Sequence, residues 1–260
     1  MTIHFSKYQG TGNDFIMIDA IHSDYPELTE EQIRFLCSGK FGVGADGLIR
    51  LEKKPGVDFY VNYYNSDGSQ SFCGNGARCA IAFAFSCGIV SDDCRFGAID
   101  GVHEGEMLPD GTVRLKMGEI SGFRKIEEDY FLDTGSPHYV RFLEQETFPD
   151  IVTFGKQIRY NDEFCAIGTN VNHVLEKKDG TLWVETYERG VEDETYSCGT
   201  GVTAVALLHG KIRNEQEGSR TIVTKGGTLN VRWKINEQGA YEEVWLEGPA
   251  VLVFKGEIDV

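Results

Sequence analysis

The sequence lacks long apolar runs and is poor in basic residues. No stretch approaches the roughly 18 consecutive apolar residues of a membrane-spanning helix. Among 260 residues there are 25 Lys and Arg against 41 Asp and Glu, and the formal net charge is −16. Nucleic acids and anionic membranes repel such an acidic surface, so we expect neither as a partner. A small-molecule site stays open, because such a site can be locally basic.

The beginning of the chain shows no sign of a secretory signal. Residues 1–8 alternate apolar and polar side chains and have no apolar core of the kind a signal peptide needs. We therefore expect a soluble, cytoplasmic protein. The seven cysteines are an odd number without a compact framework, which favours reduced thiols in a chain of this length.

Two short stretches repeat one local design, a lone cysteine before a Gly-x-Gly turn. They are Cys73-Gly74-Asn75-Gly76 and Cys198-Gly199-Thr200-Gly201. Each leads into an Ala-rich apolar segment that predicts a buried helix, with a left-handed cap expected at Gly88 and at Gly210. A thiol at the start of a helix lies in the positive end of the helix dipole, which favours the thiolate.

The remaining pattern is dominated by short strands separated by turn signals. Each half has several strands, one buried helix and more strands, and this order argues against a doubly wound parallel sheet. The two cysteines lie 198 − 73 = 125 positions apart, close to half the chain, which suggests a duplication. We predict an α/β (α+β-like) protein of two pseudo-symmetric domains, residues 1–118 and 119–249. Each is a curved, barrel-like, mostly antiparallel sheet around a central helix.

Several chemistries could use a cysteine at such a turn. Neither turn has a Cys-x-x-Cys or a histidine at ligand spacing, so zinc is a poor interpretation and we expect no metal. A redox disulfide stays open, although dithiol enzymes usually place their cysteines close in sequence. A Cys-His nucleophile would need only one turn. The glycine-rich segment 42–47 lacks the spacing of a dinucleotide or phosphate loop and is interpreted as a structural turn.

Inversion of a carbon stereocentre needs two acid/base groups. One removes a proton from one face and the other delivers a proton to the opposite face, and the reverse reaction exchanges the roles. Two thiols in matched settings meet this requirement, because helix starts lower the thiol pKa toward neutrality. The N–H groups around Gly74, Asn75, Gly199 and Thr200 would bind a carboxylate and stabilise charge that develops beside it.

Five motifs together resemble those of the diaminopimelate epimerase family. They are Gly10-Thr11-Gly12-Asn13-Asp14-Phe15, Asn65-Ser66-Asp67-Gly68-Ser69, Cys73-Gly74-Asn75-Gly76-Ala77-Arg78-Cys79, Gly168-Thr169-Asn170-Val171-Asn172, and Tyr187-Glu188-Arg189-Gly190 leading to Cys198-Gly199-Thr200-Gly201. They span residues 10–201 in the order of the family. The resemblance implies a pyridoxal-phosphate-independent enzyme, without a cofactor, that interconverts LL- and meso-2,6-diaminopimelate in lysine and peptidoglycan precursor biosynthesis.

The resemblance also implies an assembly and a set of site residues. It implies that the last strand of the chain, 250–260, packs with the first domain and that the active site lies between the domains. It also implies that the enzyme is a homodimer. Cys73 and Cys198 would be the two bases, with His138 and Glu188 tuning the thiols. The residues that would bind substrate are Asn13, Asn65, Gly74, Asn75, Asn170, Glu188, Arg189, Gly199 and Thr200. Arginine suits the distal carboxylate, and amides with Glu188 suit the ammonium groups.

Two positions depart from the family pattern, and two other readings stay open. Ser136 stands where many members have Asn, and Gly47 where some have Gln. One alternative is a proline or hydroxyproline racemase-like enzyme of the same fold, whose substrate has one zwitterionic head. A single-acid isomerase of that fold would lack one cysteine. The other alternative is a non-catalytic amino acid binding protein, against which both thiols and both carboxylate-binding turns are intact.

Overall fold

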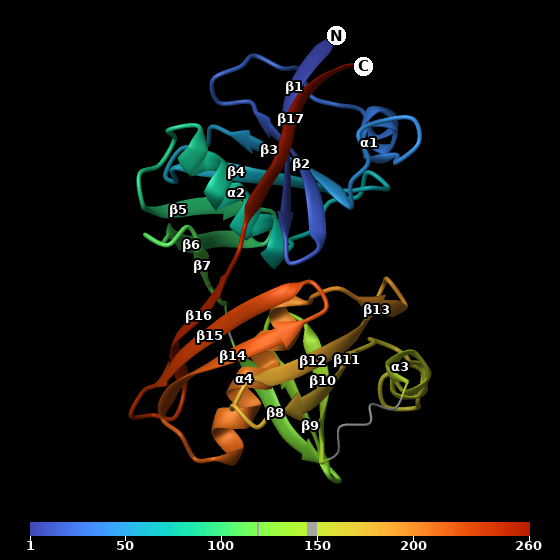
Figure 1. The fold of residues 1–260 in the computed structure, drawn as a ribbon, viewed down its shortest axis with the longest axis vertical. Coiled ribbons are helices and arrows are strands. Elements are labelled where there is room, and N and C mark those ends of the chain that lie inside the picture. Colours follow the sequence, from blue (N-terminus) through green and yellow to red (C-terminus); the bar gives the residue numbers. More distant parts are fainter. Residues whose placement is uncertain (119, 145–149) are drawn as a thin grey trace. The chain divides into compact units, whose positions relative to one another are not determined.

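The structure, a computed structural model, describes residues 1–118, 120–144 and 150–260 (Figure 1). The described chain divides into two compact units. The first comprises Met1–Leu115 and Gly248–Val260, and the second comprises Lys116–Glu247. Position 119, where we expected the second half to begin, lies outside the described residues. The C-terminal segment belongs to the first unit, where its last strand pairs with the first strand of the chain.

The first unit is built on eight strands in the order β17, β1, β2, β3, β4, β5, β6, β7. Their bounds are β1 (Thr2–Gly10), β2 (Asn13–Asp19), β3 (Gly47–Glu52), β4 (Phe59–Asn65), β5 (Asp93–Ala98), β6 (Gly101–Met107), β7 (Val113–Lys116) and β17 (Val251–Asp259). Neighbours are antiparallel except for two parallel pairs, β2 with β3 and β4 with β5. Helix α1 (Glu30–Cys37) and helix α2 (Gly74–Ser86) form the crossovers of those parallel pairs.

The second unit repeats this plan. Its strands run in the order β8, β9, β10, β11, β12, β14, β15, β16, and the short β13 also pairs with β12. Their bounds are β8 (Ser121–Ile126), β9 (Asp129–Asp133), β10 (Pro137–Leu143), β11 (Asn170–Glu176), β12 (Leu182–Glu188), β13 (Asp193–Thr195), β14 (Glu217–Thr224), β15 (Gly227–Ile235) and β16 (Tyr241–Gly248). As in the first unit, the third and fifth pairs of neighbouring strands are parallel, here β10 with β11 and β12 with β14. Helix α3 (Ile151–Arg159) and helix α4 (Gly199–Ile212) form the crossovers of these two pairs. The predicted fold class is confirmed.

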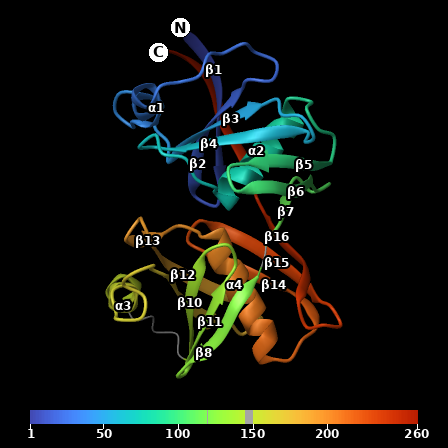
Figure 2. The same cartoon turned by 180° about the vertical axis from the view of Figure 1, so that it is seen from behind.

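A buried helix forms the centre of each unit. Helix α2 packs against β1, β2, β3, β4 and β6, and α4 packs against β9, β10, β11, β14 and β15. Figure 2 shows α4 between the strands β10 and β11 and the strands β14 and β15. Both helices are rich in Ala and Gly, because the surrounding strands approach them closely. At Gly76, for example, a Cβ would lie only 3.1 Å from Ile49 and 3.3 Å from Phe15.

Of the two predicted helix ends, one is confirmed and the other is wrong. Helix α2 stops before Gly88, whose φ of 70° is the expected left-handed conformation. At the corresponding place in α4 the prediction is wrong, because the helix continues through Gly210 to Ile212. Gly210 is glycine for a packing reason, since a Cβ there would lie 2.3 Å from the indole ring of Trp233. Asn214 takes the left-handed conformation instead, with φ 58°.

Membrane and metal features were also sought in the part of the chain that the structure describes. There, no helix is long and apolar enough to cross a membrane. No group of three or more His, Cys, Asp or Glu side chains is arranged to hold a metal ion within those same residues.

Candidate active site

Cys73 occupies the N-cap of α2. Its backbone is extended, with φ −134° and ψ 117°, and its sulfur accepts a hydrogen bond from the Gly76 N–H at 3.5 Å. The thiol also lies 3.4 Å from Oδ1 of Asn13, to which it can donate. The side chain is half-buried and forms no disulfide. The first unit therefore places a thiol at the positive end of a buried helix.

Cys198 occupies the same position in α4. Its φ of −121° and ψ of 113° nearly match those of Cys73, and its side chain is 7% exposed. The sulfur lies 3.4 Å from the hydroxyl oxygen of Thr200. Each unit thus places one cysteine at the N-cap of its central helix, and the local backbone is the same in both.

A chain of hydrogen bonds leads from the core of the second unit to Cys198. Asn172 donates its amide N–H to the Tyr139 carbonyl at 3.0 Å and to Nδ1 of His138 at 3.2 Å. Of the two amide donors that face the ring, Asn172 is the nearer, so we assign Nδ1 as the acceptor and Nε2 as the protonated nitrogen, which donates to the Thr200 hydroxyl at 2.9 Å; the Asn170 amide lies farther from Nε2, at 3.4 Å. That hydroxyl has its own proton left to donate to the Cys198 sulfur. The expected link between His138 and the thiol hence runs through Thr200.

His138 is a neutral imidazole at physiological pH. Burial of the ring, aided by the positive charge of Arg189, lowers the pKa of His138 to about 3. The ring is fully buried and stays neutral because its protonation would leave a cation without solvent. The neutral ring therefore connects to Cys198 through the Thr200 hydroxyl and brings no charge of its own. Sequence reasoning missed Asn172, whose amide N–H donates to the ring, although it lies within a motif quoted above.

Asn170 and Arg189 contact each other in the second unit. The Oδ1 atom of Asn170 accepts the Arg189 backbone N–H at 2.8 Å, and its Nδ2 lies 3.4 Å from Nε2 of His138. The Arg189 guanidinium donates to the Ile167 carbonyl at 3.0 Å. Glu188, the last residue of β12, is half-buried beside Arg189. Asn170 thereby connects Arg189 to His138, which reaches the start of α4 through Thr200.

Asn13 is held in place by a carboxylate that sequence reasoning missed. Its amide N–H donates to Oδ2 of Asp46, and the same oxygen accepts the Asp14 backbone N–H at 3.1 Å. Asp14 in turn forms a 2.7 Å ion pair with Lys7, which is only 5% exposed. This network directs Oδ1 of Asn13 toward Cys73. Asp46 lies in the glycine-rich segment 42–47, so that turn also positions a residue of the candidate site.

Asn65 is placed differently from the other predicted residues. It ends β4, and its amide N–H donates to the hydroxyl groups of Ser69 and Ser71 at 3.0 and 3.1 Å. Its Oδ1 accepts the Tyr63 hydroxyl at 2.9 Å. No hydrogen bond within the described chain joins Asn65 to Cys73. The structure therefore gives Asn65 a role in its own turn, and any contact with a ligand would exchange one of these bonds.

The remaining predicted residues begin the two central helices. Gly74, Asn75, Gly199 and Thr200 supply first-turn N–H groups, which lack acceptors within a helix. Asn75 is 4% exposed, and its Oδ1 accepts a hydrogen bond from Arg78 at 3.0 Å. A carboxylate is the ligand that such helix starts favour.

Both positions that depart from the family pattern have a structural setting. Gly47 lies in β3, where a Cβ would meet the Tyr63 ring at 2.4 Å and the Tyr64 carbonyl oxygen at 2.6 Å. A glutamine at 47 therefore does not fit the packing of this chain. Ser136 lies in the turn before β10, where its carbonyl accepts the Thr134 N–H.

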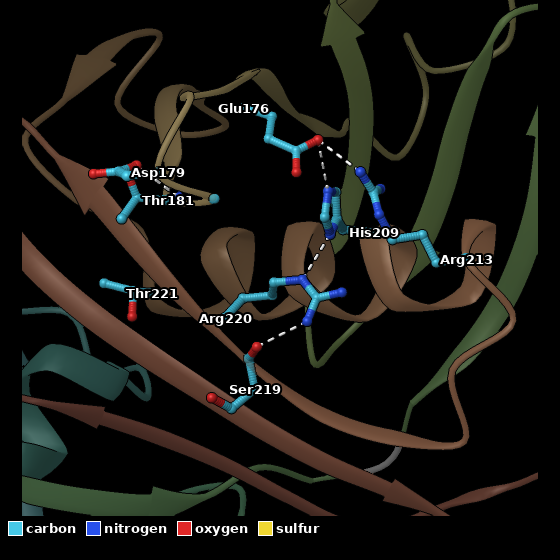
Figure 3. A pocket seen from close by; sticks show the side chains of 9 residues that line it. Glu176, Asp179, Thr181, His209, Arg213, Ser219, Arg220 and Thr221 are labelled. Atoms are coloured by element: carbon cyan, nitrogen blue, oxygen red, sulfur yellow. Dashed lines mark hydrogen bonds and ion pairs between the residues drawn. The ribbon is translucent and has the colours of Figure 1, made fainter.

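A separate pocket of about 350 Å³ lies in the second unit (Figure 3). Its polar lining consists of Glu176, Asp179, Gly180, Thr181, His209, Arg213, Ser219, Arg220 and Thr221. Arg213 pairs with Glu176 at 2.7 Å, and Nδ1 of His209 accepts from Arg220 at 2.7 Å. The lining contains no cysteine and none of the predicted site residues, so this pocket is distinct from the candidate active site.

The duplicated fold is shared with a class of amino acid racemases and related isomerases. A hydroxyproline epimerase from Agrobacterium vitis superposes with a TM-score of 0.70 at 14% identity, over 99% of this chain and 92% of the other. A phenazine biosynthesis protein of the PhzF family from Bacillus anthracis gives a TM-score of 0.74 at 13% identity over the full length of both chains. At such low identity these likenesses establish the fold alone.

Sequence comparison gives the family. The family model described as diaminopimelate epimerase matches residues 5–122 and 130–253. The diaminopimelate epimerase of Flavobacterium psychrophilum is 42% identical over 253 residues, or 97% of this chain and 98% of the relative. That of Chlorobaculum tepidum is also 42% identical, over 260 residues, or 96% and 98% of the two chains. This chain belongs to the diaminopimelate epimerase family, and it is an amino acid epimerase.

Proposed function

We propose that the protein interconverts LL- and meso-2,6-diaminopimelate by proton transfer between the α-carbon of the substrate and two thiols of the protein. The observation that carries the proposal is the matched placement of Cys73 and Cys198 at the N-caps of two equivalent buried helices. Epimerisation needs one base and one acid on opposite faces of a carbon. A duplicated fold supplies two such groups of the same chemical kind.

The proposed reaction proceeds without a cofactor. One cysteine, as thiolate, takes the α-proton, and the electron pair of the broken C–H bond moves toward the carboxylate. The other cysteine, as thiol, delivers its proton to the opposite face and becomes the thiolate. Helix-start N–H groups of Gly74, Asn75, Gly199 and Thr200 stabilise the negative charge on the carboxylate. Proton transfer by a positioned group contributes about 10²–10⁴-fold, so this electrostatic support must supply much of the remaining acceleration.

Substrate recognition is assigned to the polar residues around the two turns. The distal carboxylate matches the guanidinium of Arg189, which offers a planar set of donors. The ammonium groups match the amide oxygens of Asn13, Asn65 and Asn170 and the carboxylate of Glu188. The neutral His138 tunes Cys198 through Thr200, and Glu188 would act as the second tuning residue.

Two alternatives would use the same fold differently. A proline or hydroxyproline racemase-like enzyme would act on a one-ended amino acid, and a binding protein would hold an amino acid without exchanging its proton. Glu188, Arg189 and Asn13 favour the two-ended substrate, because a proline has no second head to bind.

The decisive experiment is incubation of the purified protein with LL-diaminopimelate in deuterium oxide. We expect incorporation of solvent deuterium at the α-carbon together with formation of the meso isomer. Mass spectrometry detects the deuterium, and chiral chromatography detects the isomer. Cys73→Ala and Cys198→Ala should each lose epimerisation by about 100-fold or more. Full epimerisation by both variants, or no exchange by the wild-type protein, would refute the proposal. Proline and hydroxyproline serve as comparison substrates, and binding of diaminopimelate without exchange would favour the binding-protein reading.

We further propose that the enzyme serves lysine and peptidoglycan precursor biosynthesis in the cytoplasm. Both placements follow from the proposed substrate. Full activity of a preparation with no visible absorbance band would support the absence of pyridoxal phosphate.

The proposed assembly is a homodimer formed by the first unit. Its end strand β17 exposes four consecutive apolar side chains, Val251, Leu252, Val253 and Phe254, each between 41% and 54% exposed. An apolar run on an end strand favours association with another chain. We expect light scattering to give twice the chain mass of 29.0 kDa, and Leu252→Glu to give the monomer. Lys255→Glu, on the same strand, is the control that should stay dimeric; a monomeric wild-type protein would contradict the proposal.

A further inference from the structure

Asp46 ends the glycine-rich segment 42–47 as its last residue before β3. The Oδ2 atom of its carboxylate accepts two N–H groups, one from the side-chain amide of Asn13 and one from the backbone of Asp14 at 3.1 Å. In return, the backbone N–H of Asp46 donates to Oδ1 of Asp14 at 2.9 Å. These reciprocal bonds join the segment to the start of β2, where Asn13 lies.

The segment that carries Asp46 is itself anchored. The carbonyl oxygen of Asp46 accepts the Ser66 backbone N–H at 3.0 Å. The buried Lys7 donates to the Gly44 carbonyl and forms its 2.7 Å ion pair with Asp14. The carboxylate of Asp46 therefore has a defined position, although the residue as a whole is exposed.

The chemistry of this carboxylate decides which way round the Asn13 amide lies. A carboxylate only accepts hydrogen bonds, whereas an amide side chain has one accepting oxygen and one donating NH2 group. The NH2 group of Asn13 must therefore face Asp46, because the turned amide would place its oxygen against a carboxylate oxygen. The amide oxygen is left on the other side, where the Cys73 thiol donates to it at 3.4 Å.

Cys73 is thus subject to two opposite influences. The helix dipole and the Gly76 N–H, 3.5 Å from the sulfur, both favour the thiolate. The Asn13 oxygen favours the thiol, because it accepts a hydrogen bond from S–H and repels a negatively charged sulfur. A group that must both take and deliver a proton needs both forms, and the acceptor counters the effect of the helix start.

We propose that Asp46 is a positioning residue that fixes the Asn13 amide with its oxygen toward Cys73 and thereby stabilises the thiol form of Cys73. This inference rests on the proposed two-thiol reaction, in which Cys73 must be able to deliver a proton. Asp46 acts on the sulfur through the orientation of Asn13. The segment 42–47, which the sequence indicates to be a structural turn, then takes part in setting the protonation of the site.

The test is the pH dependence of thiol alkylation in the free protein, with neutral iodoacetamide as the probe and peptide mass spectrometry to follow each cysteine separately. Asp46→Ala frees the Asn13 amide to turn its NH2 group toward the sulfur. We expect the alkylation midpoint of Cys73 to fall by about half a pH unit to one pH unit, the effect of one neutral hydrogen bond. A turn that merely loosened would change access to Cys73 at every pH and leave the midpoint in place.

Asp46→Asn separates the orientation of the amide from the charge of the carboxylate. It removes the negative charge but keeps an oxygen that can accept from Asn13, so its Cys73 midpoint should lie closer to wild type than that of Asp46→Ala. The other ionisable groups of α2 and of the strands packed against it are the same in both variants. They are His4, Lys7 and Tyr8 (β1), Asp14 and Asp19 (β2), Arg50 and Glu52 (β3), Tyr60, Tyr63 and Tyr64 (β4), His103, Glu104 and Glu106 (β6), and Arg78 and Cys79 (α2).

A double variant tests whether Asp46 acts through Asn13. Asn13→Ala alone removes the acceptor and should lower the Cys73 midpoint, and Asp46→Ala added to it should cause no further shift. Cys37 is the internal control for the fold of the segment, because it is 7% exposed and its carbonyl accepts the Ala45 N–H at 3.0 Å. It should resist alkylation in every variant.

Three results would each overturn the inference. The first is an Asp46→Ala protein with a protected Cys37 and an unaltered Cys73 midpoint. The second is an equal shift in the Ala and Asn variants of Asp46, which would assign the effect to charge alone. The third is an Asn13→Ala protein whose Cys73 midpoint lies at or above wild type, a comparison that leaves the segment 42–47 intact.

These outcomes are independent of the deuterium experiment, because no substrate is present during alkylation. A protein that exchanges no α-proton can still show a Cys73 midpoint that depends on Asp46 and Asn13. An active epimerase can equally lack this dependence.

Discussion

At the scale of single residues, Thr200 is the group through which the core of the second unit reaches its thiol. Its hydroxyl lies 2.9 Å from Nε2 of His138 and 3.4 Å from the sulfur of Cys198, to which it can donate. Its backbone is fixed separately, because the Thr200 carbonyl accepts the Thr134 hydroxyl at 2.8 Å. The hydroxyl can therefore be removed while the helix start keeps its place.

We predict that Thr200→Val raises the pKa of Cys198. The lost hydroxyl no longer donates to the sulfur, so the thiolate is less stable, and alkylation of Cys198 at pH 7 should slow by up to about tenfold. Peptide-resolved alkylation measures this. Thr200→Ser keeps the donor and is the matched control, and Cys73 should react alike in all three proteins. Equal Cys198 rates in the Val and Ser variants would contradict the assigned hydrogen bond.

At the scale of elements, the two central helices owe their composition to the sheets around them. Their small residues let strands pack directly against helix backbone. Gly210 shows the point, since it stands inside α4 and faces the ring of Trp233. A glycine in a helix usually costs stability, and here it is retained because no larger residue fits.

We predict that Gly210→Ala destabilises the second unit. Alanine improves helix propensity by at most about 1 kcal/mol, but its Cβ would lie 2.3 Å from Trp233, and such overpacking costs about 1–3 kcal/mol. Urea unfolding followed by tryptophan fluorescence is suitable, because the three tryptophans, Trp183, Trp233 and Trp245, all lie in the second unit. Gly39→Ala, where a Cβ would meet no atom within 4 Å, should change little. A midpoint equal to wild type would contradict the packing argument.

At the scale of the whole molecule, the same succession of strand directions occurs in both units. Each has two antiparallel pairs, a parallel pair, an antiparallel pair, a parallel pair and two antiparallel pairs. Two unrelated halves would not be expected to share this pattern together with the placement of both helices. The repeated fold therefore explains why two cysteines of the same local geometry occur in one chain.

Buried histidines should make the second unit sensitive to mild acid. Burial lowers the pKa of His138 to about 3 and that of His173 to about 4, while both titrate near 6.5 when unfolded. The unfolded chain hence binds more protons below pH 6.5, and stability falls as pH decreases toward those folded values. Each histidine contributes up to about 1.4 kcal/mol per pH unit.

We predict that His173→Gln reduces this pH dependence by about one proton. The free energy of unfolding in urea, measured between pH 6.5 and 5 by tryptophan fluorescence, gives the slope directly. His173 stacks on Phe154 and lies outside the candidate site, so the variant should retain epimerase activity. An unchanged slope would show that His173 is not a buried neutral group.

The sequence by itself determined the fold class and the position of a cysteine before each central helix. Composition, strand pattern and the paired turns predicted the fold class, and a thiol before Gly-x-Gly has to start a helix because the turn and the Ala-rich segment after it are local signals. Cys73 and Cys198 could be chosen on that basis, since the role proposed for them depends on the helix that follows immediately in the chain.

Only the tertiary structure decided which groups act on those thiols. The Thr200 link to His138 and the carboxylate of Asp46 behind Asn13 both join segments distant in sequence. In the sequence Gly210 likewise indicates a helix end, and only the fold shows that Trp233 packs against it. The physical reason is that a dipole and a turn are properties of neighbouring residues, whereas burial and hydrogen-bond partners depend on strands that the fold brings together.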